Sequence, residues 1–300
     1  MTSTAPPRLA PYTNWPAAAT NIQDAIDAAD PGDLVLLTNG LYQTGGAVAK
    51  KDFTTNRVAL TKPITVQSVN GPAVTTILGV HADFRLSIPP VRCAFLTNGA
   101  TLIGFTLTSS QAGSSGAGGV ACALSSGPAA APTAVISNCL LTGGLSTRGG
   151  AAYGLVLHNC TVTGNAARKG GGAYDCILND CVISNNVANG DQPTFPPPGY
   201  GGGAYRCTLN GCLITANTAT QVGGGAYQSY MTNCLINANS RTPDIGMKSH
   251  CVVFRSFDPE NAIRVRGFCP CDALHTQRLL THSAEELLSI SRKPSVCQEV

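Results

Sequence analysis

The sequence has little charge and few aromatic side chains. Of its 300 residues, only 12% are Asp, Glu, Lys or Arg and 6% are Phe, Trp or Tyr. A disordered acidic or basic tail is excluded, because such tails carry a high density of like charges. The net charge is only +3, and no run of Lys or Arg is longer than two residues. We therefore expect no nucleic-acid partner.

Long apolar runs are also missing. No stretch approaches the ~20 apolar residues of a membrane-spanning helix, and the first 16 residues lack the apolar core of an export signal. We expect no membrane-spanning segment and see no signal peptide in this chain. Glycine and cysteine, in contrast, are abundant, with 33 and 13 residues. The odd number of cysteines excludes complete pairing into intramolecular disulfides.

The glycines belong to an internal repeat. A phrase of two or three glycines and one or two alanines ends four times in a tyrosine, and a cysteine follows each tyrosine seven residues later. The tyrosines are Tyr153, Tyr174, Tyr205 and Tyr227, and the cysteines are Cys160, Cys181, Cys212 and Cys234, preceded by Cys139. The cysteine spacings are 21, 21, 31 and 22 residues, and the long spacing contains a proline-rich insertion from Asp191 to Gly199. Without this insertion the period is constant.

The period and the short alternating segments predict an all-β solenoid. Successive coils of a solenoid stack ~4.8 Å apart, so equivalent residues form columns. We expect the five cysteines to form an internal column, as buried thiols in preference to disulfides. A second column, Asn165, Asn186, Asn217 and Asn239, is expected to adopt left-handed turns and to hydrogen-bond from coil to coil.

The repeat divides the chain into three predicted parts. Residues 1–15 form an N-terminal extension, residues 16–240 the solenoid, and residues 241–300 a non-repeat segment. A capping-box pattern at Thr20–Gln23 predicts a capping helix over about residues 20–30. Upstream of the clear repeats, Phe105 occupies the cysteine position of an earlier coil. The last 60 residues hold fifteen charged side chains, and they form either a cap on the last coil or a segment that does not pack against it.

Several segments resemble a known superfamily. The segments Asn21–Ala29, Pro31–Leu37 and Gly40–Tyr42, followed by Leu60–Ser68, resemble the N-terminal part of pectate-lyase-like β-helix proteins. The glycine-rich tyrosine repeats are similar to those of large bacterial surface and autotransporter-like β-helix proteins. The resemblance implies a right-handed parallel β-helix and an extracellular or cell-surface location. It implies no single function, because the superfamily contains lyases, hydrolases and adhesins.

Few residues are candidates for chemistry. Asp175 and Arg206 occupy the same repeat position, so we expect an ion pair between neighbouring coils, with a structural role favoured over a catalytic one. Asp180 replaces the asparagine or glycine of other copies, which indicates a turn. Asp175, Asp180 and Asp191 are too scattered for a typical calcium site, so we expect no metal or other cofactor, with calcium as the minor alternative.

The tyrosine column allows two interpretations. Tyr174 and Tyr205 share strand parity with the following Cys176 and Cys207, which favours rings that stack inside the core over an exposed sugar-binding strip. Tyr200 and Phe195 belong to or border the insertion, the loop that breaks the period, and they are further binding candidates.

Turns and stacking account for nearly every repeated residue. The sequence therefore favours a non-catalytic scaffold of a secreted or cell-surface protein, adhesive or carbohydrate-contacting, with a polysaccharide or other glycan as partner and a monomeric state. The alternative is an enzyme, a polysaccharide lyase or glycoside hydrolase of the same superfamily.

Overall fold

The computed structural model describes residues 18–19, 21–48, 54–83, 85–97, 99–111, 120–122, 132–189 and 199–241. The predicted N-terminal extension, Phe195 and nearly all of the segment 241–300 lie outside these residues, so the predicted division of the chain stays a prediction. Within the described part, no helix is long and apolar enough to cross a membrane.

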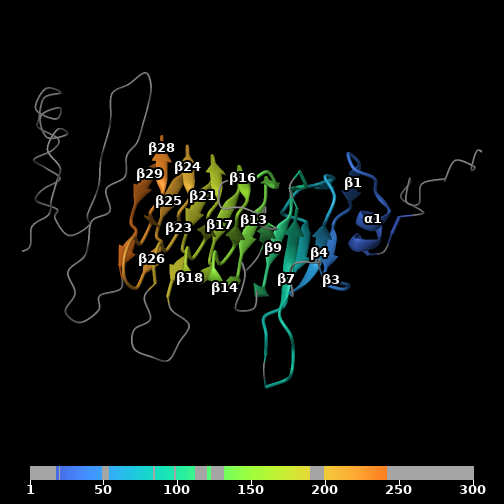
Figure 1. Cartoon of the computed structure of the whole chain (residues 1–300), viewed down its shortest axis with the longest axis horizontal. Coiled ribbons are helices and arrows are strands. Elements are labelled where there is room, and N and C mark those ends of the chain that lie inside the picture. The colour runs from blue at the N-terminus through green and yellow to red at the C-terminus, as the bar shows by residue number, and fades with distance from the viewer. Residues whose placement is uncertain are drawn as a thin grey trace, which may run out of the picture. The chain divides into compact units, whose positions relative to one another are not determined.

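The described chain winds into a right-handed parallel β-helix, as predicted, with one helix near its start (Figure 1). Each coil contributes a strand to each of three long sheets, and later coils add a strand to a fourth. The first sheet contains β1 (Leu34–Leu37), β5 (Thr65–Ser68), β8 (Thr101–Ile103), β12 (Val135–Ser137), β16 (Val156–His158), β20 (Ile177–Asn179), β24 (Thr208–Asn210) and β28 (Tyr230–Thr232). The second contains β2 (Gly40–Tyr42), β6 (Thr75–Leu78), β9 (Thr106–Thr108), β13 (Leu140–Thr142), β17 (Thr161–Thr163), β21 (Val182–Ser184), β25 (Leu213–Thr215) and β29 (Leu235–Asn237).

The third sheet carries the tyrosines. It contains β3 (Ala47–Val48), β4 (Thr55–Leu60), β7 (Val91–Leu96), β11 (Val120–Cys122), β15 (Ala152–Tyr153), β19 (Ala173–Tyr174), β23 (Ala204–Tyr205) and β27 (Ala226–Tyr227). The fourth contains β10 (Ser110–Gln111), β14 (Gly144–Arg148), β18 (Ala166–Lys169), β22 (Val187–Ala188), β26 (Thr218–Ala219) and β30 (Ser240–Arg241). All strand pairs are parallel except β3 with β4.

The register places equivalent repeat positions side by side. Leu157 of β16 pairs with Ile136 of β12 on one side and with Leu178 of β20 on the other, and all three side chains are fully buried. Burial of such a side chain contributes ~2 kcal/mol to stability. Phe105 is fully buried at the start of the cysteine column, where its amide donates to the Cys139 sulfur over 3.3 Å, as its repeat position predicted.

The corner between the first and second sheets uses left-handed residues. Asn138, Asn159, Asp180 and Asn233 have φ angles of 51°, 51°, 54° and 54°. Asparagine and aspartate tolerate this conformation better than other non-glycine residues. Asp180 is therefore a turn residue.

The asparagine column is internal. Asn186 accepts from the backbone and side-chain amides of Asn165 over 3.1 and 2.9 Å, and its own side-chain amide donates to Asn217 over 2.9 Å. The predicted coil-to-coil hydrogen bonding is confirmed. The predicted left-handed turn was wrong for these residues, since it belongs to the residue before each of them, such as Asn185 with φ 53°. That corner turns the asparagine amide inward, where it satisfies backbone groups.

The capping helix α1 (Ile22–Ala28) lies within the predicted range of about residues 20–30. Its N-cap is Asn21, whose side-chain oxygen accepts from the Gln23 amide over 3.0 Å, so the capping box expected to start at Thr20 was wrong. Gln23 instead binds the backbone of Ala59 in β4, donating over 3.2 Å and accepting over 2.8 Å. Ile26 is fully buried in the core. The helix is thus fastened to the first coils.

Candidate functional site

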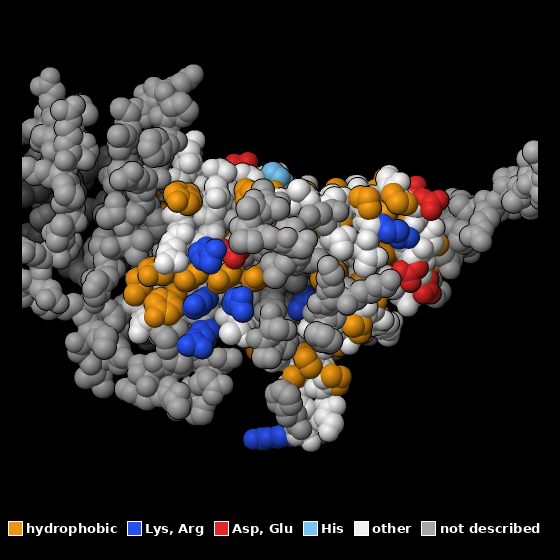
Figure 2. All heavy atoms as spheres, viewed as in Figure 1, with side chains coloured by type: hydrophobic (Ala, Val, Ile, Leu, Met, Phe, Trp, Pro, Cys, Tyr) orange, Lys and Arg blue, Asp and Glu red, His pale blue; other side chains and the backbone are white. Residues whose placement is uncertain are grey.

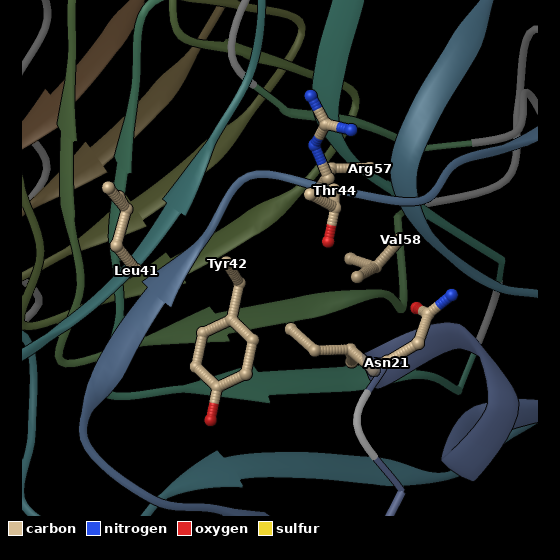
Figure 3. Close-up of a pocket in the computed structure, with 7 residues that line it drawn as sticks. Asn21, Leu41, Tyr42, Thr44, Arg57 and Val58 are labelled. Atoms are coloured by element: carbon tan, nitrogen blue, oxygen red, sulfur yellow. The ribbon is translucent and has the colours of Figure 1, made fainter.

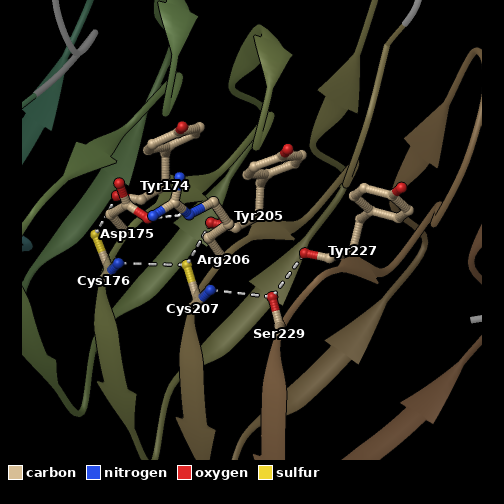
Figure 4. A network of polar contacts seen from close by, with 8 residues as sticks. All are labelled: Tyr174, Asp175, Cys176, Tyr205, Arg206, Cys207, Tyr227 and Ser229. Atoms are coloured by element: carbon tan, nitrogen blue, oxygen red, sulfur yellow. Dashed lines mark hydrogen bonds and ion pairs between the residues drawn. The ribbon is translucent and has the colours of Figure 1, made fainter. Parts of the chain in front are cut away.

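The four repeat tyrosines form a stacked ladder on the third sheet. The ring centres of Tyr153 and Tyr174 lie 5.3 Å apart, and those of Tyr174 and Tyr205 lie 5.1 Å apart, with interplanar angles of 6° and 5°. Tyr227 follows at 5.5 Å with a tilt of 38° (Figure 4). We call these four residues and Tyr200 the tyrosine ladder.

The predicted buried stack is confirmed for Tyr174 and Tyr205, which are 7% and 8% exposed. The rings do not belong to the main core cluster, however, so the prediction that they point inward was wrong. Ala173 and Ala204 contribute to the core from the same short strands, which turns the adjacent tyrosines to the outer face. Asp175 and Arg206 then adopt φ angles of 50° and 54° and interrupt the strand. A left-handed residue breaks the alternation of side chains between the two faces of the strand. Cys176, which follows Asp175, therefore points into the core. Stacking itself was correctly anticipated, and it leaves Tyr174 only 7% exposed.

The glycine phrase makes room for the ladder. Gly170 has a φ of +65°, and a Cβ built there would lie 3.3 Å from the Cβ of Tyr205. A Cβ on Gly171 would lie under 3.0 Å from the carbonyl oxygen of Gly202 in the next coil. Any side chain here would force neighbouring coils apart, because backbone atoms cannot move aside as a side chain can.

Basic side chains border the ladder. The Lys169 ammonium lies 5.6 Å from the ring centre of Tyr205 and 5.9 Å from that of Tyr200, within cation–π distance. Burial raises the pKa of Tyr153, while the charge and hydrogen bond of Arg148 oppose this shift. Figure 2 shows Lys and Arg side chains gathered beside hydrophobic ones towards the C-terminal end of the described chain.

Asp175 and Arg206 form the ion pair that the sequence predicted. Arg206 Nε lies 3.0 Å from Asp175 Oδ1. Burial raises the pKa of Asp175 more than Arg206 and Arg148 lower it, and Asp175 in turn raises the pKa of Arg206. The pair is partly exposed, so its contribution to stability is under about 1 kcal/mol. The only carboxylate described at the ladder is therefore already engaged with a cation.

The other predicted acidic candidate lies elsewhere. Asp180 is at the corner that follows β20, whereas Asp175 precedes that strand, so the structure does not bring the two into one site. Asp191 is outside the described residues. Among those described, no group of three or more His, Cys, Asp or Glu side chains is placed to hold a metal ion.

Tyr200, a predicted binding residue, directly follows the insertion and lies beside the repeat tyrosines. Its backbone bridges Lys169 on one side and Val222 on the other. Its ring centre lies 5.5 Å from that of Tyr227, tilted by 35°. The second insertion candidate, Phe195, lies outside the described residues.

Sequence reasoning missed the basic residues of the ladder. Arg148 and Lys169 pair in register, and each stands directly before the first glycine of its phrase. Tyr200 occupies the equivalent position in the next coil. This recurring position next to the glycines was the signal that could have identified a cationic and aromatic column.

A separate pocket of about 140 Å³ lies near α1, lined by residues that include Asn21, Tyr42, Thr44 and Arg57 (Figure 3). The Arg57 guanidinium points away from the Tyr42 ring in this view. It donates to the carbonyl of Leu78 over 2.9 Å and to that of Gly45, and burial lowers its pKa. Arg57 therefore ties the first coils together.

Comparison with known proteins yields structural similarity only. No protein-family model matches the chain, and no curated protein matches its sequence. Among solved structures, the pectate lyase Pel9A is similar with 15% identity and a TM-score of 0.45, covering 81% of this chain and 72% of that one. An alginate lyase from Paenibacillus sp. str. FPU-7 has 13% identity and a TM-score of 0.29, covering 74% of this chain and 92% of that one. Values this low carry no argument about function.

Proposed function

We propose that this chain is a non-catalytic β-helix scaffold that binds an acidic polysaccharide along the tyrosine ladder. The observation that carries the proposal is the composition of this face. Stacked tyrosines are bordered by the cations Arg148, Lys169 and Arg206, and the one carboxylate described there is paired with Arg206.

The geometry of the ladder supports a charged and extended ligand. Within the stack, each ring face is covered by the next ring, so the ladder offers ring edges and hydroxyl groups more than faces for neutral sugars. Guanidinium and ammonium groups bind carboxylates or sulfates through charge-assisted hydrogen bonds. Because the pattern repeats every ~4.8 Å along the solenoid, it suits a polymer with regularly spaced groups.

The arrangement of acidic residues supports a binding role without catalysis. Glycoside hydrolysis and acid–base elimination need groups that converge on one bond. Asp175 precedes β20 and Asp180 follows it, so the two lie near opposite ends of the strand, and Asp175 is paired with Arg206. The proposal includes a secreted or cell-surface location and a monomeric state.

The test is calorimetric titration of the full chain with polygalacturonate, alginate and the neutral polymer dextran. We expect binding of the two acidic polymers that weakens with added salt, and no binding of dextran. Lys169→Gln and Arg206→Gln should each weaken binding about tenfold, which corresponds to ~1.4 kcal/mol. Arg85→Gln is the matched control, since Arg85 is exposed on a hairpin away from the ladder and its loss changes the net charge equally.

Two outcomes would overturn the proposal. If Lys169→Gln and Arg206→Gln bind the acidic polymers as tightly as the control Arg85→Gln, the ladder is not the binding site. Release of unsaturated sugars that stops in Asp175→Ala or Arg206→Ala would instead establish the lyase alternative. Deletion of residues 191–198 measures what the insertion, with Phe195, adds to binding.

A further inference from the structure

The cysteines of the solenoid form two internal columns of free thiols. The longer column contains Cys139, Cys160, Cys181, Cys212 and Cys234. The shorter one, Cys176 and Cys207, continues into Ser229, whose hydroxyl accepts from the Cys207 amide over 3.1 Å (Figure 4). The proposed binding function uses neither column.

The two columns differ at the last described coil. Cys234 is only partly buried, whereas the other seven cysteines whose burial is described are buried. In the shorter column the equivalent coil carries a serine, which cannot form a disulfide. A thiol with partial access to solvent therefore occurs at the end of one column only.

From this arrangement we infer that Cys212 and Cys234 are an oxidisable pair that forms a disulfide between the last two described coils. Leu213 pairs in register with Leu235, and the Leu235 amide donates to the Cys212 carbonyl over 2.9 Å. The two cysteines, each directly before one of these strands, thus occupy equivalent positions on adjacent coils. Strands ~4.8 Å apart fall within the Cα separation of about 4.4–6.8 Å that disulfides require.

The chemistry balances with a small disulfide as oxidant. Cys234 loses its proton to solvent, and its thiolate attacks oxidised glutathione, which releases one glutathione thiolate. Cys212 then loses its proton to the released glutathione thiolate, and the Cys212 thiolate attacks the Cys234 sulfur. This step releases the second glutathione as a thiolate, which takes up a proton from solvent in place of the one that Cys234 lost. Two protein thiols are oxidised while one glutathione disulfide is reduced to two thiols. A hydrogen bond with Cys212 raises the pKa of Cys234, so the reaction accelerates as the pH rises.

The disulfide would act on the end of the ladder. It would cross-link the residues that directly precede β25 and β29 and close a loop that contains β27 with Tyr227. Oxidation would hold the last coil against its neighbour. This inference does not depend on the identity of any ligand.

The experiment uses the full chain, incubated with oxidised glutathione at about pH 9, above the ~8.5 pKa of an unperturbed thiol, because the raised pKa of Cys234 lowers its thiolate fraction. Remaining thiols are then alkylated in denaturant and the protein is digested with trypsin. Cleavage after Arg206 and Arg241 releases one peptide that contains Cys207, Cys212 and Cys234. We expect this peptide to carry one alkyl label and to have lost two hydrogens.

Two variants sharpen the test. Cys234→Ser should leave both remaining thiols of the peptide fully labelled, and Ser229 shows that serine fits the end of such a column. Cys207→Ser is the matched control. Its peptide should carry no alkyl label, because its two remaining cysteines, Cys212 and Cys234, still form the disulfide. Three labels on the wild-type peptide would overturn the inference. Glutathione retained on Cys234 beside a labelled Cys212, or a bond from Cys234 to a cysteine outside this peptide, would do the same.

Discussion

The residue after each of the four repeat tyrosines adopts a left-handed backbone conformation. The residues are Gly154, Asp175, Arg206 and Gln228, with φ angles of 64°, 50°, 54° and 51°. A non-glycine residue in this conformation costs ~1 kcal/mol. The fold accepts this cost three times, and the result is a row of tyrosines on the outer face.

This position explains why the direction of the rings was not predictable. Glycine, aspartate, arginine and glutamine share no turn chemistry, so the four copies give no common signal for a left-handed residue. Counting alternate residues along an uninterrupted strand then placed Tyr174 and Cys176 on the same side. The stacking needed only the period, and it was predicted correctly.

Asp175→Asn tests the role of the ion pair between Asp175 and Arg206. The asparagine keeps the turn preference and removes the negative charge, so Arg206 is no longer shared between Asp175 and the ligand. We expect the affinity for polygalacturonate to rise about threefold, with unfolding free energy changed by less than about 1 kcal/mol. Calorimetric titration and urea denaturation measure the two quantities. A loss of affinity would show that Asp175 itself binds the ligand.

The asparagine column stabilises the stacking of coils through side-chain hydrogen bonds from each coil to the next. Asn186→Ala would leave the Val162 carbonyl and the Asn165 amide without their partners, now at 2.9 and 3.1 Å. Each buried orphan group costs ~1–3 kcal/mol, so we expect a loss of about 3 kcal/mol in unfolding free energy. Asn239→Ala, at the partly exposed end, should cost about 1 kcal/mol. Equal losses in urea denaturation would contradict the column as described.

The glycine phrases test the close approach of coils. Gly171→Ala would place a Cβ under 3.0 Å from the Gly202 and Val187 carbonyl oxygens, so we expect a loss above about 4 kcal/mol or failure to fold. Gly71→Ala is the control, because nothing lies within 4 Å of its Cβ position and only its φ of +84° opposes the change. That strain costs ~1 kcal/mol. Similar melting temperatures for both variants would contradict the proposed reason for the glycines.

At the scale of the whole molecule, the buried thiols couple stability to pH. Burial is the largest cause that raises the pKa of Cys93 and Cys139 to about 11. A thiol in the unfolded chain has a pKa of ~8.5, so the folded state holds more protons above that pH. The stabilisation is complete below about pH 8.5 and is lost as the pH rises towards 11.

Urea denaturation at several pH values, with reductant present, measures this effect. Unfolding free energy should fall above pH ~8.5 by up to ~1.4 kcal/mol per pH unit for each thiol that titrates only when unfolded. Replacing Cys93 with alanine should make the fall less steep. A stability that does not change between pH 8 and 10, values spanning the ~8.5 pKa of an unfolded thiol, would contradict the burial of these thiols.

The repeat length of the sequence was enough to predict the stacking of coils and most of the core positions. Repeats of 21 or 22 residues placed Cys160 above Cys139 and Leu178 above Leu157 without further information, because register in a solenoid follows from repeat length. The cations beside the ladder were not predicted. Arg148 and Lys169 precede the glycine phrase of their coils and Arg206 follows it, so only the folded coils bring all three to one face. The composition of a face depends on the corners, which local pattern does not define.

Hydroxyl-radical footprinting of the tyrosines tests the central claim most directly. Tyr153, Tyr200 and Tyr227 are partly exposed on the ladder, while Tyr230 is 72% exposed on the first sheet and serves as an internal control. With saturating polygalacturonate we expect oxidation of the three ladder tyrosines to fall several-fold and that of Tyr230 to stay unchanged. Protection of Tyr230 alone, or no protection of any tyrosine while calorimetry reports binding, would contradict the tyrosine ladder as the binding surface.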